Sequence, residues 1–533
     1  MLVGDIARRN AEYYGDRDAV IDPTTRTISW SELNQRTDRL ARALRRLGVT
    51  KGERLAMFAP NCVEYVEYYF ACAKSGIVGA PLNLRSSVSE VRAYVNYVEP
   101  AAVLVHAADE AAAREWLSST PLVRNVIGFG GDHRFDLDLE HLIASEEAGS
   151  GPCNATADDA YMLCPTSGTT GRSKAAVLTQ GNAMSAIFGW LADYPVVEHD
   201  TNLQCIPQYL NAGGPSHVHP VFLKGGRSVV LPGFKADSFL RAIRDYRVTH
   251  TVAVPTMIEA VLAHPDIEHV DTSSLRCVVL GGAPLTRELV VAARASLGDC
   301  LYPTLGMAET FSCGLFLSPQ NQHPNGTEKQ IRQLGSLGRP HTHLLARITD
   351  ADGNEVPADG ATAGELWLQG DCVSAGYFAM PAESAAAHEG PWLKTGDVAV
   401  VDEDGFITIV DRLKDIIISG GYNVASIEVE AALASHPGVA ECAVIGRPHP
   451  KWGEAVHAVV VRAPNVELDE HDLGAHLDGL LARYKHPKTF SFVDQLPRNP
   501  TGKVLKRILR EQFSFLVGDQ RTLNSPTTSE SLR

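Results

Sequence analysis

Apolar and polar positions along the first part of the chain alternate between helical and strand spacing. Residues 31–47 carry apolar side chains near helical spacing and are followed by Gly48, so the pattern predicts an amphipathic helix that ends there. The same pattern predicts a helix at 64–74 and strands at 54–59 and 76–81. Alternating helices and strands of this kind indicate an α/β domain with layered sheets and a parallel component.

The pattern changes in the last third of the chain. Residues 345–410 contain short alternating runs separated by turn signals, which predicts a β-rich segment. A dense charged run at 411–415 follows, and we place a domain boundary there. The unit beyond it is predicted to contain a helix at 427–433, strands at 440–445 and 455–461, and a helix at 470–481. The expected domains are residues 1–410 and 411–514, with a disordered Ser/Thr-rich tail at 515–533.

One loop carries a dense set of groups that can bind an anion. Two short apolar runs, 161–164 and 175–179, lie on either side of the nine residues 166–174, which are rich in hydroxyls and glycines and end in Lys174. Glycine lets the backbone turn tightly and approach an anion, and the spacing differs from the GxxxxGK[ST] loop. A flexible linker does not fit two flanking strands and a lysine. We therefore predict a phosphate-binding loop between two strands, formed by Thr166, Ser167, Gly168, Thr169, Thr170, Gly171 and Lys174.

Composition limits the classes of function. The 533 residues carry a formal net charge of −15, which argues against broad binding of nucleic acids or anionic membranes. We expect no membrane span, and the N-terminus lacks the apolar run of a signal peptide. Ten cysteines are scattered without a CxxC pair, which is not typical of a zinc site or a disulfide framework. We expect reduced, mostly buried thiols in a cytoplasmic protein; a homodimer is compatible with these features.

Two further segments carry weaker signals when taken alone. The apolar strand at 277–280 runs into glycines, where the backbone can approach a flat or anionic ligand. Glu309 follows a glycine in the segment 302–310. A lone glutamate in a loop is usually solvated, but near a phosphate loop it can also be a magnesium ligand, and both interpretations stay open at this point.

Six motifs in a fixed order resemble the adenylate-forming superfamily, which includes acyl-CoA synthetases, aryl-CoA ligases, luciferases and peptide-synthetase adenylation domains. The resemblance covers roughly residues 5–512. The NAGG, GGAPL and GGYNV segments, which begin at Asn211, Gly281 and Gly420, are most similar to the fatty-acyl and aryl-CoA ligase branch. The resemblance implies an α/β fold with a large N-terminal domain of several subdomains and a small, mobile α/β C-terminal domain.

The same resemblance implies roles for single residues. Glu309 matches the magnesium-binding carboxylate, Asp397 the residue that hydrogen-bonds the ribose, and Arg412 its helper. Lys414 matches the hinge between the domains, and Lys503 the lysine that bridges the substrate carboxylate and the α-phosphate. The hydroxyls of the loop and Lys174 match the residues that hold the β- and γ-phosphates of ATP. The other nucleotide-binding candidates are Gly281, Gly282, Ala283, Pro284, Tyr302, Leu305, Gly306 and Met307, and the acid-pocket candidates are Tyr209, Leu210, Asn211, Gly213, His217 and Met257.

The chain departs from the family pattern at five positions. Ser173 and Ala175 stand where a proline usually precedes and a glycine usually follows the loop lysine, and Leu210 stands where a histidine is common. Leu305 and Ala308 replace the tyrosine and threonine of a YGxTE motif. Leu305 removes an aromatic face from the adenine pocket, a loss of about 1 kcal/mol of stacking. Leu210 lies near the acyl pocket, so it bears on the acceptor more than on acid activation.

The resemblance favours an ATP-dependent carboxylic acid–CoA ligase for a fatty or aromatic acid. It would use Mg²⁺ and ATP and release AMP and pyrophosphate. One alternative keeps the adenylate and changes the acceptor to a carrier-protein thiol or an amine, or activates nitrite for attack by an arylamine. Another is an inactive binding or scaffold protein. The retention of Lys174, Glu309, Asp397 and Lys503 argues against that last alternative.

Overall fold

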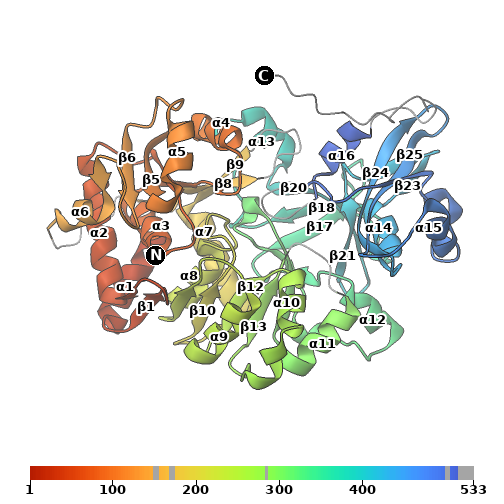
Figure 1. The fold of residues 1–533 in the computed structure, drawn as a ribbon, viewed down its shortest axis with the longest axis horizontal. Helices are drawn as coiled ribbons and strands as arrows, with labels where there is room; N and C mark the ends of the chain where they lie inside the picture. The colour runs from red at the N-terminus through yellow and green to blue at the C-terminus, as the bar shows by residue number, and fades with distance from the viewer. Residues whose placement is uncertain (148–154, 167–173, 282–285, 499–503, 514–533) are drawn as a thin grey trace, which may run out of the picture. The chain divides into compact units, whose positions relative to one another are not determined.

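The computed structural model describes residues 1–147, 155–166, 174–281, 286–498 and 504–513. The chain divides into two compact units (Figure 1). The first contains Met1–Thr395 and Val400–Thr408, and the second contains Gly396–Ala399 and the chain from Ile409 onward. The domain boundary that we place at residue 410 stays a prediction, and the expected tail at 515–533 lies outside the described residues.

Two large sheets form the frame of the first unit. The seven-stranded sheet has the order β7-β6-β5-β3-β4-β8-β9, and the nine-stranded sheet has the order β16-β15-β14-β13-β12-β10-β11-β1-β2. The strands of the first sheet are β3 (Arg54–Phe58), β4 (Val78–Pro81), β5 (Pro100–His106), β6 (Asn125–Phe129), β7 (Leu137–Asp138), β8 (Ala160–Thr166) and β9 (Lys174–Thr179). Those of the second are β1 (Asp18–Ile21), β2 (Thr27–Ser29), β10 (Thr201–Gln204), β11 (Arg227–Val230), β12 (His250–Ala253), β13 (Cys277–Leu280), β14 (Leu301–Gly306), β15 (Gly314–Phe316) and β16 (Arg339–Pro340).

Alternating side chains of β3 explain why helices cover both faces of the seven-stranded sheet. Leu55 and Met57 belong to one hydrophobic core with residues of α3 (Val63–Ser75), whereas Ala56 and Phe58 belong to another with Trp116 of α5 (Glu110–Leu117). Successive side chains of a strand point to opposite faces, so both faces of this sheet are buried. The strand β3 pairs in parallel with β4 and β5, which confirms the predicted layered α/β fold.

The nine-stranded sheet is covered in the same way. Phe239, Ile258 and Leu289 from α9, α10 and α11 pack on one face, and Trp190 and Phe222 from α7 and α8 belong to the core on the other. That second core also includes residues of the seven-stranded sheet, so these helices lie between the two sheets. The helices of the unit are α1 (Val3–Tyr14), α2 (Trp30–Arg46), α3 (Val63–Ser75), α4 (Val88–Val98), α5 (Glu110–Leu117), α6 (Leu139–Ala144), α7 (Gln180–Asp193), α8 (Pro215–Leu223), α9 (Ala236–Tyr246), α10 (Pro255–Leu262), α11 (Arg287–Leu297), α12 (Glu328–Leu334) and α13 (Pro381–Ala387).

A third sheet confirms the β-rich segment predicted after residue 345. It has the order β17-β18-β20-β19, with β21 paired to β20. Residues 390–391 join the antiparallel pair β19 and β20, and the predicted turn at 404–405 lies between β20 and β21, whereas the longer segment 350–363 joins the antiparallel pair β17 and β18. The strands are β17 (Leu345–Thr349), β18 (Gly364–Gln369), β19 (His388–Glu389), β20 (Trp392–Val401) and β21 (Ile407–Arg412).

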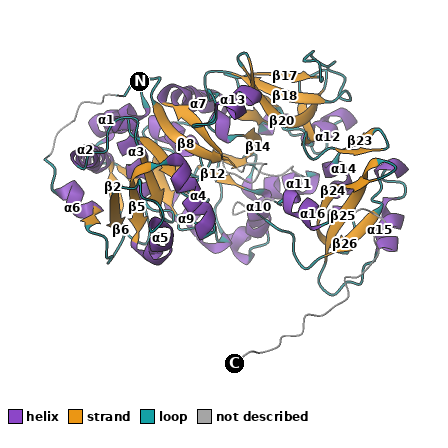
Figure 2. Cartoon of the chain, turned by 90° about the horizontal axis from the view of Figure 1, so that it is seen from above, coloured by secondary structure: helices purple, strands orange, loops and turns teal. Residues whose placement is uncertain are grey.

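The second unit is a small α/β fold. Val444 and Ile445, neighbours on β24, pack into two different cores, the first with α14 and α15 and the second with α16. The strands of this unit form one sheet in the order β23-β22-β25-β24, with β26 paired to β25, and Figure 2 shows α15 and α16 on opposite sides of it. Its elements are β22 (Ile417–Ser419), β23 (Tyr422–Val424), α14 (Ser426–Ala434), β24 (Val439–His449), β25 (Gly453–Arg462), α15 (Glu470–Leu477), β26 (Thr489–Phe492) and α16 (Lys506–Gln512).

The helix predicted at 470–481 is shorter than expected. It ends at Leu477, because Asp478 adopts an extended backbone with a ψ of +120° and Gly479 follows with a φ of +90°, which a right-handed helix does not contain. Among the described residues, no helix has both the length and the apolar character needed to span a bilayer.

Candidate active site

The predicted phosphate-binding loop joins two antiparallel strands. Thr166 at the end of β8 pairs with Lys174 at the start of β9, so the two ends of the loop meet at a hairpin tip. The pairing of the flanking apolar runs holds Lys174 at the mouth of the loop. The other predicted loop residues, Ser167, Gly168, Thr169, Thr170 and Gly171, lie outside the described residues.

A tyrosine from a distant segment connects this lysine to the predicted magnesium ligand. The Nζ atom of Lys174 lies 4.7 Å from the centre of the Tyr377 ring. The hydroxyl of Tyr377 donates a 2.8 Å hydrogen bond to Oε1 of Glu309. A cation over an aromatic face and a hydroxyl on a carboxylate are both favourable contacts, so the three side chains form one cluster.

Backbone pairing fixes the position of Tyr377. The amide of Phe378 donates to the carbonyl of Ala175 at 2.8 Å, and that of Val177 donates to the carbonyl of Gly376 at 3.0 Å. The segment around Tyr377 therefore runs along β9. The sequence pattern did not identify Tyr377, since a lone tyrosine in a β-rich region has no distinguishing spacing.

Glu309 is buried, with 8 % of its surface exposed. Its carbonyl oxygen accepts a 2.7 Å hydrogen bond from the amide of Ser374, which fixes the short 3-10 turn that carries it. Burial, and to a smaller extent the charge of Glu309, raise the pKa of the Cys164 thiol on β8. The carboxylate thus lies near the strand that leads into the predicted phosphate-binding loop. A buried carboxylate in this position is suited to hold a hard divalent cation.

The predicted nucleotide-binding segments lie at strand ends of the nine-stranded sheet. Gly281 directly follows β13, and Gly282, Ala283 and Pro284 lie outside the described residues. The β14 residues Leu305 and Gly306 pair with β15. A Cβ atom on Gly306 would lie 2.4 Å from the carbonyl oxygen of Ser312, so only glycine fits there. The other two predicted members, Tyr302 and Met307, lie on β14 and directly after it.

The second unit holds the predicted ribose-binding pair. Arg412 Nη1 and Asp397 Oδ1 form an ion pair and hydrogen bond, and the Asp397 side chain is only 4 % exposed. Lys414 is exposed, and its carbonyl oxygen accepts a hydrogen bond from Arg510 at 3.4 Å. Lys503 lies outside the described residues.

The predicted acid-pocket segment between β10 and α8 is tightly folded. A Cβ atom on Gly213 would lie 2.2 Å from the carbonyl oxygen of Pro207, so the turn requires glycine. Tyr209 and Asn211 are buried, and neither the tyrosine hydroxyl nor the side-chain amide of Asn211 has a hydrogen-bond partner among the described residues. Buried polar groups without partners are rare, which is consistent with a site that receives a ligand. Leu210 is half-buried and Met257 on α10 is buried.

A cavity of about 20 Å³ lies between α7, α8 and the nine-stranded sheet. Of the acid-pocket candidates, His217 lines it. Trp190, Tyr194 and His250 line it as well, and each has a buried polar atom with no partner in the described chain. The sequence pattern did not identify these three, because they lie on elements whose apolar spacing predicts only a core. The remaining lining residues are Val196, Asn202, Pro220, Thr251, Cys277 and Val279.

His219, two residues after His217 on α8, is a core residue and should make the stability of the protein sensitive to acid. It is 1 % exposed and packs beside Phe70 and Phe222. Burial lowers its pKa from 6.5 to about 3. The unfolded chain therefore binds a proton below pH 6.5 that the folded chain does not, so the free energy of unfolding falls as the pH drops from 6.5 towards 3.

We expect His219→Gln to lose part of this pH dependence. One such histidine accounts for about 2 kcal/mol between pH 6.5 and 5. Thermal unfolding followed from pH 7 to pH 5 should show a shallower fall in the variant than in the original chain. The exposed His141, replaced in the same way, serves as the control and should leave the slope unchanged. Equal slopes for all three proteins would contradict the assignment of His219.

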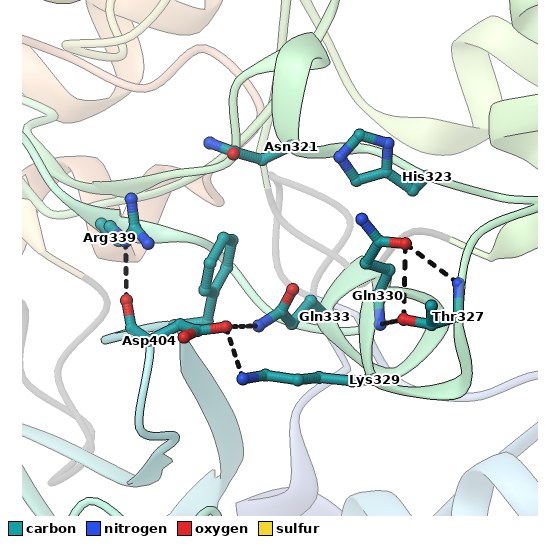
Figure 3. Close-up of a pocket in the computed structure, with 9 residues that line it drawn as sticks. Asn321, His323, Thr327, Lys329, Gln330, Gln333, Arg339 and Asp404 are labelled. Atoms are coloured by element: carbon teal, nitrogen blue, oxygen red, sulfur yellow. Dashed lines mark hydrogen bonds and ion pairs between the residues drawn. The ribbon is translucent and has the colours of Figure 1, made fainter.

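The pocket drawn in Figure 3 is polar and lies away from the predicted site residues. It has a volume of about 400 Å³ and is lined from α12 and its neighbours. Its charged and amide groups bind one another. Lys329 Nζ forms a 2.7 Å ion pair with Oδ2 of Asp404, and Gln333 Nε2 donates a 3.0 Å hydrogen bond to the same oxygen. These pairs leave few groups free to recognise a ligand, so we assign no function to this pocket.

Comparison with known proteins assigns the chain to a family. The model of the AMP-binding enzyme family matches residues 7–378, and that of the AMP-binding enzyme C-terminal domain matches residues 428–503. A feruloyl-CoA synthase from Amycolatopsis sp is 36 % identical over 486 residues, which cover 91 % of this chain and 94 % of that protein.

Solved structures share the fold over almost the whole chain. ATP-bound MatB from Rhodopseudomonas palustris superposes with a TM-score of 0.85 at 30 % identity, covering 96 % of this chain and 99 % of that one. The amide bond synthetase McbA from Marinactinospora thermotolerans superposes with a TM-score of 0.84 at 28 % identity, covering 96 % and 100 %. The chain therefore belongs to the AMP-binding enzyme family, and it is an ATP-binding, adenylate-forming enzyme of the acid–CoA ligase type.

Proposed function

We propose that the protein joins a fatty or aromatic carboxylic acid to coenzyme A through an acyl-adenylate. The observation that carries this proposal is the cluster of Lys174, Tyr377 and Glu309 at the tip of the β8–β9 hairpin. It combines a cation for phosphate oxygens with a buried carboxylate for Mg²⁺. The similarity to a feruloyl-CoA synthase supports an aromatic acid in particular.

The charges of the proposed site suit the first half-reaction. Attack of a carboxylate on the α-phosphorus brings two anions together, and pyrophosphate leaves. Mg²⁺ held by Glu309 and the ammonium of Lys503 would offset the repulsion and stabilise the charge that develops in the transition state. Lys174 and the hydroxyls of the loop would hold the β- and γ-phosphates. In the second half-reaction, the thiol of coenzyme A attacks the acyl carbon and AMP leaves; Lys414 is our proposed hinge between the two steps.

Pyrophosphate release from a panel of acids, with and without coenzyme A, tests the proposal. We expect fast release with an aromatic or fatty acid, and a thioester detected by mass spectrometry when coenzyme A is present. Pyrophosphate release without thioester formation would overturn the choice of acceptor and leave acid activation intact. The absence of pyrophosphate with every acid and with nitrite would overturn the proposal as a whole.

An amine is the second candidate acceptor. The fold is as similar to an amide bond synthetase as to MatB, and Leu210 replaces the histidine that is common near the acyl pocket. The same panel with small primary amines in place of coenzyme A distinguishes the two acceptors. Amide formation that exceeds thioester formation under matched concentrations would favour this candidate.

Asp397→Asn should weaken the use of ATP. We propose that Asp397 accepts hydrogen bonds from the ribose, and the variant also removes the charge that pairs with Arg412. Each hydrogen bond to a charged group contributes about 1.5–3 kcal/mol, so we expect KM for ATP to rise at least about tenfold. Steady-state kinetics with saturating acid measure this change. An unchanged KM for ATP would show that Asp397 has only a structural role.

A further inference from the structure

Three turns of the first unit bring together two thiols and an imidazole, none of which belongs to the cluster of Lys174, Tyr377 and Glu309. The Sγ atoms of Cys313 and Cys372 and a ring nitrogen of His343 all lie within 4.8 Å of one another. We propose that this cluster is a structural zinc site.

The ligands come from two different sheets. Cys313 directly precedes β15 of the nine-stranded sheet. His343 lies in the turn after β16, two residues before β17, and Cys372 lies in the turn after β18; β17 and β18 both belong to the third sheet. Backbone hydrogen bonds fix the turns that carry the two cysteines. The amide of Cys313 donates to the carbonyl of Thr310 at 3.0 Å, and the amide of Val373 donates to the carbonyl of Gly370 at 3.0 Å. A metal ion at this point would join the two sheets.

The burial of the cluster leaves polar groups unexplained. Cys313 and Cys372 are fully buried. Both ring nitrogens of His343 are buried and have no hydrogen-bond partner among the described residues. A neutral imidazole always has one donor and one acceptor, so two buried, unpartnered nitrogens cost free energy unless something absent from this chain binds them.

The donor set selects a soft, tetrahedral metal ion. Zn²⁺ binds thiolate sulfur at about 2.3 Å and imidazole nitrogen at about 2.0–2.1 Å, whereas Mg²⁺ and Ca²⁺ prefer oxygen. Ligands at those bond lengths lie about 3.3–3.8 Å apart in a tetrahedron, so the three atoms need to close by only about 1 Å.

Two further polar side chains lie beside His343. Asp193 and His341 lie within 4.8 Å of it, and the two are themselves joined by a 2.9 Å hydrogen bond from Nδ1 of His341 to Oδ2 of Asp193. The His341 side chain is fully buried, and its Nε2 atom has no partner in the described chain. His341 is therefore the candidate for the fourth ligand, with the Asp193 carboxylate orienting its ring in the way that carboxylates orient zinc-bound histidines.

Helix α7 leaves room for the His343 ring. A Cβ atom on Gly189 would lie 1.9 Å from Nδ1 of His343 and 2.0 Å from Cε1. Gly189→Ala would therefore displace the imidazole without changing either thiol. It provides a geometric test that is independent of the cysteine substitutions.

The site would support the catalytic cluster without taking part in the reaction. Cys313 lies four residues after Glu309 in the same short segment. The carbonyl oxygen of Glu309 accepts a hydrogen bond from the amide of Ser374, which lies two residues after Cys372. Zinc at this point would tie together the two segments that position Glu309 and Tyr377. The proposal does not depend on which acid is activated.

Metal analysis of the full chain tests the site. The protein is expressed with zinc in the medium and purified without an immobilised-metal step or chelator, and its zinc is measured by mass spectrometry. We expect about one zinc ion per chain, lost in Cys313→Ser, Cys372→Ser and Gly189→Ala. Cys442→Ser, at a half-buried thiol of the second unit, is the matched control and should keep the zinc.

Cobalt substitution covers the case in which a variant fails to fold. The unaltered chain, stripped of zinc by a chelator and reloaded with Co²⁺ under reducing conditions, should show the intense visible absorption of a four-coordinate thiolate site. Chelation should also lower its melting temperature. A chain that contains no zinc and gives no cobalt spectrum overturns the proposal, as does a Cys313–Cys372 disulfide in the native protein or full zinc retention in the three variants.

Discussion

Replacing Lys503 by alanine is expected to reduce ATP-dependent pyrophosphate release by at least about a hundredfold, while ATP binding stays nearly unchanged. By its resemblance to the family, this lysine bridges the attacking carboxylate and the α-phosphate. Its ammonium would offset the repulsion between these two anions mainly in the transition state, so its loss should lower kcat far more than it raises KM for ATP. The C-terminal family model matches residues up to this position.

A second lysine of the same unit makes the comparison specific. Lys451 is exposed and lies in no predicted site, so Lys451→Ala should leave pyrophosphate release unchanged. ATP affinity is measured for both variants by calorimetry, separately from turnover. Pyrophosphate release at the original rate in Lys503→Ala would remove this lysine from the first half-reaction. Equal losses of affinity and turnover would assign it to ground-state binding of ATP.

Glu309→Gln is expected to cause the second large loss. Glutamine keeps the shape of the side chain, and its carbonyl oxygen can still accept the hydrogen bond from Tyr377. The substitution removes only the negative charge of the carboxylate, which we propose binds Mg²⁺. We expect pyrophosphate release to fall by about a hundredfold or more, with a higher Mg²⁺ concentration needed for half-maximal rate. A magnesium titration of the initial rate measures both effects.

Tyr377→Phe is the matched variant, because it keeps the carboxylate and removes the hydroxyl that donates to it. The phenyl ring also keeps the aromatic face under Lys174. We expect a smaller loss of rate, about tenfold, since one hydrogen bond to a charged group is removed. If Glu309→Gln titrates with Mg²⁺ as the original chain does, the carboxylate is not a magnesium ligand. A tyrosine variant that is more impaired than the glutamine variant would instead assign the main role to the hydroxyl.

Local patterns predicted the frame of the active site. The apolar runs on either side of the phosphate loop predicted two strands, and the structure pairs them as β8 and β9, with Thr166 opposite Lys174. Helical spacing at 31–47 and 64–74 predicted α2 and α3 within one or two residues. Such features depend on neighbours in the sequence, because the period of a helix or strand can be recognised from the apolar and polar positions of a short segment.

The predicted helix end that was wrong depends on the backbone conformation of single residues. The helix expected to reach residue 481 ends at Leu477, since Asp478 is extended and Gly479 takes a positive φ. The apolar spacing of that segment continues past the glycine and therefore extended the prediction. Glycine permits a helix as well as a break, so its conformation is decided by the packing around it.

What the sequence by itself determined is the type of fold, the pair of strands that flanks the predicted phosphate loop, and the family to which its motifs belong. Only the tertiary structure revealed which distant side chains meet: Tyr377 bridges Lys174 and Glu309, and Cys313, His343 and Cys372 converge from three turns. The physical reason is that these contacts join residues about 30 to 200 positions apart. Their spacing along the chain carries no period, and their proximity follows from how two sheets and the helices between them pack.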